Sequence, residues 1–168
     1  VRAGPLQRGR IEEAGPEDER EGERRVDLVG CGAVPASQRV EIVNPVTLRR
    51  SAPGHVGEIW VAGPGVCSGY WGRPEETARD FAAGIIWPGG PADESEGPFL
   101  RTGDLGFLTG GELFVTGRFK DLIILRGRNL YPQDVEWTAE RSAPELAVAG
   151  GAAFSVEVDG EERLVVAQ

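Results

Sequence analysis

The sequence has few of the residues from which metal centres, disulfide frameworks and nucleophilic triads are built. Its 168 residues include one histidine, His55, and two cysteines, Cys31 and Cys67. One histidine gives little basis for a histidine-rich metal site or a Ser-His-Asp triad. The cysteines fit neither a zinc spacing nor a CxxC motif. With no histidine beside them, we expect both to be buried, inert thiols, and we expect His55 to lie in a surface turn.

Long apolar runs and an excess of basic charge are also missing. No segment approaches the roughly 18 apolar residues of a membrane span, and the chain does not start like a secretory signal. Lys and Arg number 18 against 27 Asp and Glu, a net charge of -9, which argues against a nucleic-acid partner. A nucleotide site stays open, because it needs only a few local cations and backbone donors. The expected compartment is the cytoplasm.

Methionine is absent altogether, and the first residue is Val1. The other end, from Leu164 to Gln168, stops inside an apolar, strand-like run. We therefore expect a piece of a longer protein.

Apolar periodicity and turn residues predict a chain of mixed α+β class that is mainly β. Residues 1–25 are rich in charge, Gly and Pro and predict a loop or insertion. Strands are expected at 39–43, 57–61, 65–71, 105–108, 112–116, 121–125, 148–158 and 164–167, helices at 73–81 and 132–141, and a loop at 88–98. Thr109-Gly110-Gly111 predicts a tight hairpin turn. The β-rich part gives way to a smaller α+β part near residues 118–121.

A first candidate site is Thr102-Gly103-Asp104, at a bend just before a strand. A carboxylate held at such a bend presents two acceptor oxygens, as binding a pair of ribose hydroxyls requires. The alternative is that Asp104 only closes an Asx-turn.

A second candidate is a group of four cations, Arg118, Lys120, Arg126 and Arg128, around one strand of an otherwise acidic chain. Arginine suits phosphate because its planar fork donates two parallel hydrogen bonds. The alternative is a solvated strand edge, which Lys and Arg commonly protect against aggregation.

Together these segments resemble the adenylate-forming superfamily, and within it the fatty acyl-AMP ligases. The resemblance rests on Gly57-Glu58-Ile59-Trp60-Val61, Gly69-Tyr70-Trp71, Arg101-Thr102-Gly103-Asp104, Gly117-Arg118-Phe119-Lys120-Asp121 and Gly127-Arg128-Asn129-Leu130-Tyr131-Pro132-Gln133-Asp134-Val135-Glu136. It covers residues 26–168 well and residues 1–25 loosely. Leu130 departs from the pattern, because many relatives have His there.

The resemblance implies activation of a fatty acid by ATP, with Mg²⁺, to an acyl-adenylate and pyrophosphate, followed by transfer to the phosphopantetheine of an acyl carrier protein. It implies that residues 26–119 form the barrel-like, β-rich end of a large AMP-binding domain. Residues 120–168 would then be the hinge and the first part of a small mobile domain.

Residue by residue, the resemblance implies that Asp104 binds the ribose hydroxyls, that Arg118 contacts the nucleotide and that Lys120 is the hinge. Gly127 would lie in a turn, and Tyr70 and Trp71 in the core. It assigns no catalytic residue and no metal ligand to this chain. The phosphate-binding loop and the catalytic lysine of the family have no counterpart here, so we expect the 168-residue chain alone to be inactive.

Two alternatives remain. One is an acyl-CoA synthetase, and the other is a non-catalytic module that reuses the fold to bind a nucleotide or a carrier protein.

Overall fold

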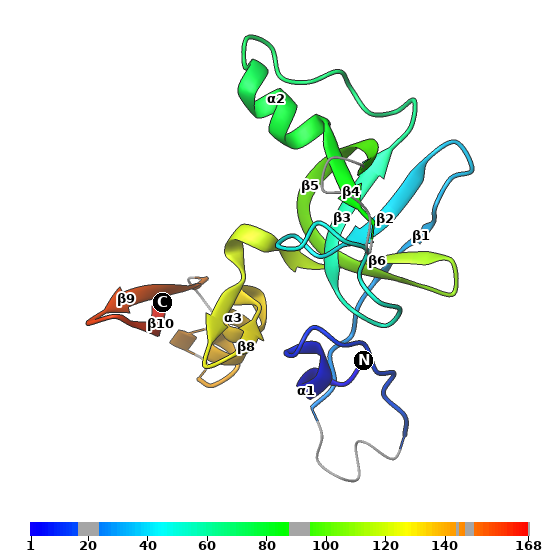
Figure 1. Cartoon of the computed structure of the whole chain (residues 1–168). Coiled ribbons are helices and arrows are strands. Elements are labelled where there is room, and N and C mark those ends of the chain that lie inside the picture. Colours follow the sequence, from blue (N-terminus) through cyan, green and yellow to red (C-terminus); the bar gives the residue numbers. More distant parts are fainter. Residues whose placement is uncertain (17–23, 88–94, 144, 147–149, 168) are drawn as a thin grey trace.

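The computed structural model describes residues 1–16, 24–87, 95–143, 145–146 and 150–167. Figure 1 shows a curved β-sheet, a helix that projects from one end of it, and a smaller group of strands and one helix to the side. Among the described helices, none has the length and apolar character to cross a membrane.

An antiparallel sheet of six strands forms the larger part of the structure. Its strands are β1 (Gly30–Ala33), β2 (Arg39–Val43), β3 (Gly57–Ala62), β4 (Ala83–Ile86), β5 (Ser95–Thr109) and β6 (Glu112–Arg118). The order is β1-β6-β5-β3-β2, and β4 pairs with the first part of β5. The expected mainly β class is therefore observed, with β1 and β2 at the two ends of the path.

The core lies where β2, β3, β4 and β5 meet. Val43, Trp60, Ile85 and Phe99 are buried against one another, and the rings of Trp60 and Phe99 lie 6.3 Å apart. Strand β3 is buried on both faces at its start, from Gly57 to Trp60.

The hairpin between β5 and β6 forms as predicted. Thr109 pairs with Glu112, and Gly110 and Gly111 between them have φ values of +58° and +81°. Both residues of such a tight turn need a positive φ, which glycine adopts without steric cost.

The last third of the chain forms two small sheets and a helix. A 3₁₀ turn, η1 (Phe119–Asp121), leads into β7 (Ile123–Leu125), β8 (Arg128–Leu130), α3 (Pro132–Glu140), β9 (Ala152–Val158) and β10 (Glu161–Ala167). β7 pairs with β8, and β9 with β10. Gly127, with φ +74°, lies in the β7–β8 turn. The sequence did not predict β8. The strand expected at 121–125 is two residues shorter, because η1 includes Asp121 and Leu122 is its C-cap.

Residues 1–25 were expected to form a loop or insertion, and the loop is wrong for Ala3–Leu6, which forms the short helix α1. The apolar side chains of Ala3 and Leu6 are buried. The Gln7 carbonyl accepts a hydrogen bond from the Asn129 amide at 2.8 Å. The Arg24 guanidinium donates to the Thr138 hydroxyl at 3.1 Å. This segment therefore packs against the last third of the chain.

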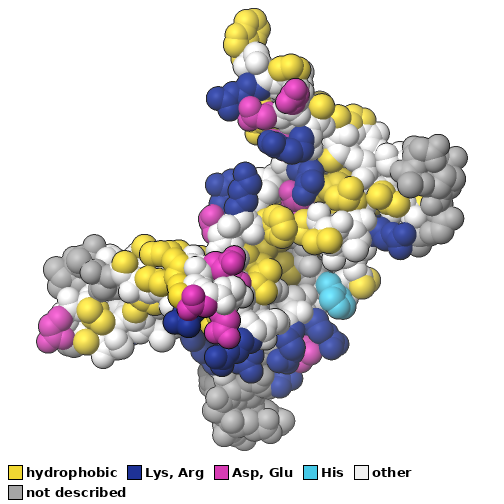
Figure 2. All heavy atoms as spheres, turned by 60° about the vertical axis from the view of Figure 1, so that its left-hand side comes forward, with side chains coloured by type: hydrophobic (Ala, Val, Ile, Leu, Met, Phe, Trp, Pro, Cys, Tyr) yellow, Lys and Arg dark blue, Asp and Glu magenta, His cyan; other side chains and the backbone are white. Residues whose placement is uncertain are grey.

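Helix α2 (Pro74–Phe81) begins at the predicted proline, but the strand expected at 65–71 is absent. The Tyr70 amide donates to the Thr77 hydroxyl at 2.9 Å, so the segment bonds to a side chain of α2 instead of pairing with a strand. Tyr70 and Trp71 were expected in the core, and this is wrong for both, since Trp71 is 100% exposed and Tyr70 47%. Figure 2 shows this end of the molecule projecting from the rest.

The loop expected at 88–98 is wrong for its last four residues. Strand β5 begins at Ser95, because Ser95 pairs with Ile86 of β4. Residues 88–94 lie outside the described part.

A network of four charged side chains ties the edge of the sheet together. Arg50 donates to Glu41 and to Glu96, each at 2.8 Å, and Arg39 pairs with the same two carboxylates. Burial on its own would raise the pKa of Glu41, but the bonds from Arg50 and Arg39 outweigh it and lower that pKa. The bond from Arg50 is the main cause that lowers the pKa of Glu96.

Replacing Glu41 by Gln should lower the free energy of unfolding at neutral pH by about 1 kcal/mol, because the pairs are partly exposed. The folded-state pKa values of Glu41 and Glu96 lie below their ordinary value of 4.5. The network therefore stabilises fully above that pH and loses its contribution as the pH falls through the lowered values. Urea unfolding from neutral to acid pH tests this. If the difference in free energy of unfolding between wild type and variant does not decrease in acid, the stabilising role of the network is contradicted.

Candidate functional site

The Thr102–Asp104 segment forms a bend within the long strand β5. Gly103 has φ +75°, a left-handed conformation that favours glycine. The Thr102 hydroxyl donates to the Ile59 carbonyl at 2.7 Å and accepts from the Asp104 amide at 3.1 Å. Thr102, not the Asp104 carboxylate, therefore closes the turn, and the Asx-turn alternative is not what the structure has.

Asp104 and Arg118 lie side by side. They are cross-strand partners on β5 and β6, and Arg118 Nε donates to Asp104 Oδ1 at 3.2 Å. The side chains are 41% and 66% exposed, respectively. An exposed pair of this kind is weak, so either group can exchange its partner for a ligand at small cost.

Behind the bend lies a carboxylate that the sequence analysis did not assign to a site. Glu58 on β3 is 2% exposed. It accepts hydrogen bonds from Arg101, the Trp60 indole and the Gly103 amide. An acid within an otherwise apolar strand was the available signal, but its partners lie on β5, far away in the sequence.

A groove of about 410 Å³ opens beside the bend, between α2, β5 and the 3₁₀ turn. Gly103, Arg101, Arg118 and Lys120 line it, together with the α2 residues Arg79 and Asp80. Arg79 donates to Asp80 at 2.7 Å. This bond, helped by the charges of Arg101 and Lys120, lowers the pKa of Asp80. The groove thus has four cations against two carboxylates, Glu58 and Asp80, and such an excess favours an anionic ligand.

The four predicted cations separate into two pairs. Arg118 and Lys120 line the groove, whereas Arg126 and Arg128 lie at the β7–β8 hairpin. Arg126 instead borders a hollow formed with β10. Of these four cations, Arg118 is the one that bonds to Asp104 in the structure.

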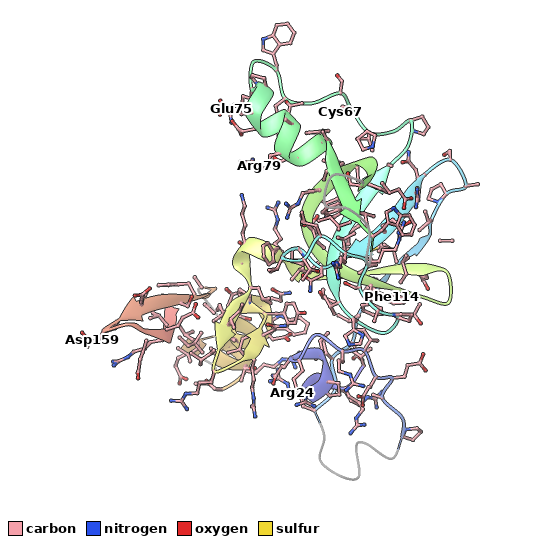
Figure 3. All side chains as sticks on the ribbon, in the orientation of Figure 1. Arg24, Cys67, Glu75, Arg79, Phe114 and Asp159 are labelled. Atoms are coloured by element: carbon pink, nitrogen blue, oxygen red, sulfur yellow. The ribbon has the colours of Figure 1, made fainter. Side chains whose placement is uncertain are left out.

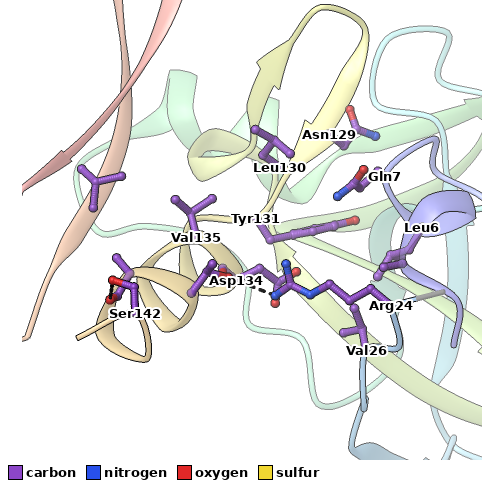
Figure 4. Close-up of a pocket in the computed structure, with 14 residues that line it drawn as sticks. Leu6, Gln7, Arg24, Val26, Asn129, Leu130, Tyr131, Asp134, Val135 and Ser142 are labelled. Carbon is purple, nitrogen blue, oxygen red and sulfur yellow. Dashed lines mark hydrogen bonds between the residues drawn. The ribbon is translucent and has the colours of Figure 1, made fainter. Parts of the chain in front are cut away.

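A second, mainly apolar cavity of about 390 Å³ lies between the N-terminal segment and α3 (Figure 4). Leu6, Val26 and Val135 line it, with Tyr131 and Asp134 as polar members. Burial raises the pKa of both Tyr131 and Asp134. The cavity shares no lining residue with the groove. In the described part of the chain, no group of three or more His, Cys, Asp or Glu side chains is placed to hold a metal ion.

Comparisons with known proteins show which family this chain resembles. The family described as AMP-binding enzyme matches residues 16–71. The chain is 52% identical over 163 residues to the medium-chain-fatty-acid–[acyl-carrier-protein] ligase JamA of Moorena producens, covering 97% of this chain and 26% of JamA. It is 47% identical over 139 residues to the long-chain-fatty-acid–AMP ligase FadD26 of Mycobacterium tuberculosis, covering 83% and 23%.

Solved structures agree in fold. One, from a study of the fatty acyl-adenylate ligases of E. coli and L. pneumophila, superposes with a TM-score of 0.70 at 35% identity and covers 95% of this chain and 25% of that one. The L. pneumophila ligase in complex with acyl adenylate and pyrophosphate gives a TM-score of 0.55 at 43% identity, with 95% and 26% covered.

The chain belongs to the adenylate-forming, AMP-binding enzymes.

Like the matched part of those adenylate-forming enzymes, the chain is mixed α+β and mainly β. It spans about a quarter of the length of the relatives it matches. The family match ends at Trp71, before Asp104 and Arg118, so the roles of those two residues remain predictions.

The expectation that both cysteines are buried is wrong. Cys31 and Cys67 are free and exposed, and Figure 3 shows Cys67 on the loop that leads to α2. Cys31 lies on β1, at one end of the sheet path, and Cys67 lies in the segment that forms no strand. An apolar-looking surrounding sequence did not bury either side chain.

Both thiols should therefore react with an aromatic disulfide reagent without denaturant. The thiolate absorbance of the released reagent counts them, and Cys31→Ser should remove half of the signal. A chain whose thiols react only after unfolding would contradict their exposed positions.

Proposed function

We propose that this chain is part of a fatty acyl-AMP ligase. In the first half-reaction, a fatty-acid carboxylate oxygen attacks the α-phosphorus of ATP, and pyrophosphate leaves. In the second, the phosphopantetheine thiol of a carrier protein attacks the acyl carbonyl, and AMP leaves. The observation that carries the proposal is the exposed Asp104–Arg118 pair beside a cationic groove, in a chain 52% identical to a fatty-acid–[acyl-carrier-protein] ligase.

The nucleotide contacts follow from the chemistry of the pair. The Asp104 carboxylate has acceptor capacity for both ribose hydroxyls. The Arg118 fork suits a phosphate, and it can turn to one because its bond to Asp104 is exposed. ATP chemistry implies Mg²⁺, but no described carboxylate cluster suits the ion, and we assign it no ligand in this part of the chain.

We further propose that residues 26–119 belong to a large AMP-binding domain and residues 120–168 to a small mobile one, with Lys120 as the hinge. In support, β6 ends at Arg118, η1 follows, and the sheets after η1 share no described strand with the six-stranded sheet. The free thiols Cys31 and Cys67 favour a reducing, cytoplasmic location.

An acyl-CoA synthetase is the competing enzyme class. Full-length protein supplied with ATP, fatty acid and both acceptors decides between them. Formation of acyl-AMP and acylated carrier protein, without acyl-CoA, supports the ligase. Efficient formation of acyl-CoA contradicts it, and the absence of acyl-AMP in the presence of nucleotide binding favours a non-catalytic module.

Asp104→Ala in the full-length enzyme should weaken ATP binding or slow adenylation by about 10- to 100-fold, because hydrogen bonds to a charged group are worth roughly 1.5–3 kcal/mol. ATP–pyrophosphate exchange measures this. Asp27→Ala, which removes an exposed carboxylate outside the groove, is the matched control and should leave exchange unchanged. An unaltered KM for ATP together with an unaltered kcat would remove Asp104 from the site.

Lys120→Pro should slow acyl transfer more than acyl-adenylate formation. Proline fixes φ near -65°, whereas a hinge must absorb a large change in backbone angles. Lys120→Ala removes the same charge but leaves φ free, so it separates the loss of rotation from the loss of charge. Single-turnover measurement of each half-reaction tests this, and equal losses in both would count against the hinge.

A further inference from the structure

We propose that Glu58 is a positioning residue for the nucleotide site, which holds the Thr102–Asp104 bend so that the Asp104 carboxylate faces the ribose. This rests on the proposed nucleotide-binding role of Asp104. Glu58 borders the groove, but it is 2% exposed and its oxygens are engaged by protein donors, so its role would act through the bend.

Both oxygens of Glu58 are engaged from several directions. Oε2 accepts from Arg101 Nη2 at 2.8 Å and from the Trp60 indole at 3.0 Å. Oε1 accepts from the Gly103 backbone amide at 3.2 Å. Arg101 Nε completes the set, at 3.1 Å from Oε2 and 3.3 Å from Oε1. Three separate groups therefore hold one carboxylate in one orientation.

Two of these three groups lie on the bend. Arg101 and Gly103 flank Thr102, and the Thr102 hydroxyl bonds to the carbonyl of Ile59, the residue after Glu58. The β3–β5 pairing shifts register between Glu58 and Trp60, so the regular ladder is interrupted beside the bend. Side-chain bonds from Glu58 and Thr102 tie the two strands together there.

Glycine at the centre of the bend is required by its backbone conformation and not by lack of space. A Cβ added to Gly103 would meet no atom within 4 Å, whereas its φ of +75° is one that other residues rarely adopt. Two hydrogen bonds hold the bend: one from the Gly103 amide to Glu58, and one from the Asp104 amide to the Thr102 hydroxyl. Asp104 follows directly, and its direction depends on the angles at Gly103.

Glutamine at position 58 cannot replace these bonds. Its amide nitrogen would face either the Gly103 amide or the Arg101 and Trp60 donors, because every partner is a donor. Arg101, whose side chain is 25% exposed, would also lose its counter-charge. Such a change loosens the bend and leaves the rest of β5 paired with β6.

The test compares AMP with 2′,3′-dideoxy-AMP, which lacks both ribose hydroxyls, by calorimetric titration of the full-length enzyme. Wild type should prefer AMP, and Asp104→Ala should abolish the preference. We expect Glu58→Gln to weaken AMP binding about 10-fold and to leave binding of the dideoxy nucleotide nearly unchanged. In the Glu58→Gln/Asp104→Ala double variant, AMP binding should be no weaker than in Asp104→Ala alone, since the two residues act through one contact.

Two further variants separate positioning from loss of stability. Glu41→Gln removes another sheet carboxylate that binds arginines, away from the bend, and should retain the full preference for AMP. Gly103→Ala strains the same bend through its backbone with space for the added methyl group, and should reduce the preference as Glu58→Gln does.

Equal weakening of both nucleotides by Glu58→Gln, or wild-type AMP binding in that folded variant, would overturn the proposal. If Glu58→Gln does not fold, Gly103→Ala decides, and an intact preference there overturns it as well. If the wild type and Asp104→Ala both bind AMP and the dideoxy nucleotide equally well, the ribose role of Asp104 is rejected. The proposed role of Glu58 is then rejected as well.

Discussion

The pairing of one long strand organises this structure. β5 has 15 residues and pairs with β4 at its start, with β3 in its middle and with β6 at its end. The core aromatic Phe99, the bend at Gly103 and the hairpin at Gly110 all lie on or directly after it. A shift of its register by one residue would turn every side chain to the other face. That shift would separate Asp104 from Arg118 and Phe99 from Trp60 together.

Two groups of charged side chains near this strand serve different purposes. The network of Arg39, Glu41, Arg50 and Glu96 joins β2, β5 and the turn before β3, and it stabilises the edge of the sheet. Glu58 is far more buried, and two of its three partners belong to a bend rather than to a regular ladder. Burying a charge costs free energy unless it is well bonded. We therefore expect the Glu58 carboxylate to fix the positions of its partners more than to raise the stability of the fold.

The sequence predicted those features that depend on neighbouring residues. The hairpin at Gly110-Gly111, the start of α2 at Pro74 and the strand β2 are set by local conformational preferences, and all three are observed, although burial along β2 does not alternate. Burial was predicted poorly, because it depends on what covers a segment. Gly65–Trp71 looks apolar, but it pairs with no described strand and leaves Cys67 and Trp71 exposed. Glu58 escaped notice because Arg101 lies 43 residues away in the chain.

Arg118 and Lys120 are only two positions apart in the sequence, and this has a consequence for the proposed rotation. Arg118 is the last residue of β6, and Lys120 lies in the turn that follows. Under the proposed rotation about Lys120, Arg118 stays with the sheet and everything from Ile123 onward swings. The contacts proposed for Asp104 with the ribose and for Arg118 with a phosphate then keep their positions during the rotation. The swinging part changes only which groups face the acyl phosphate, so one bound nucleotide can serve both half-reactions without being released or turned.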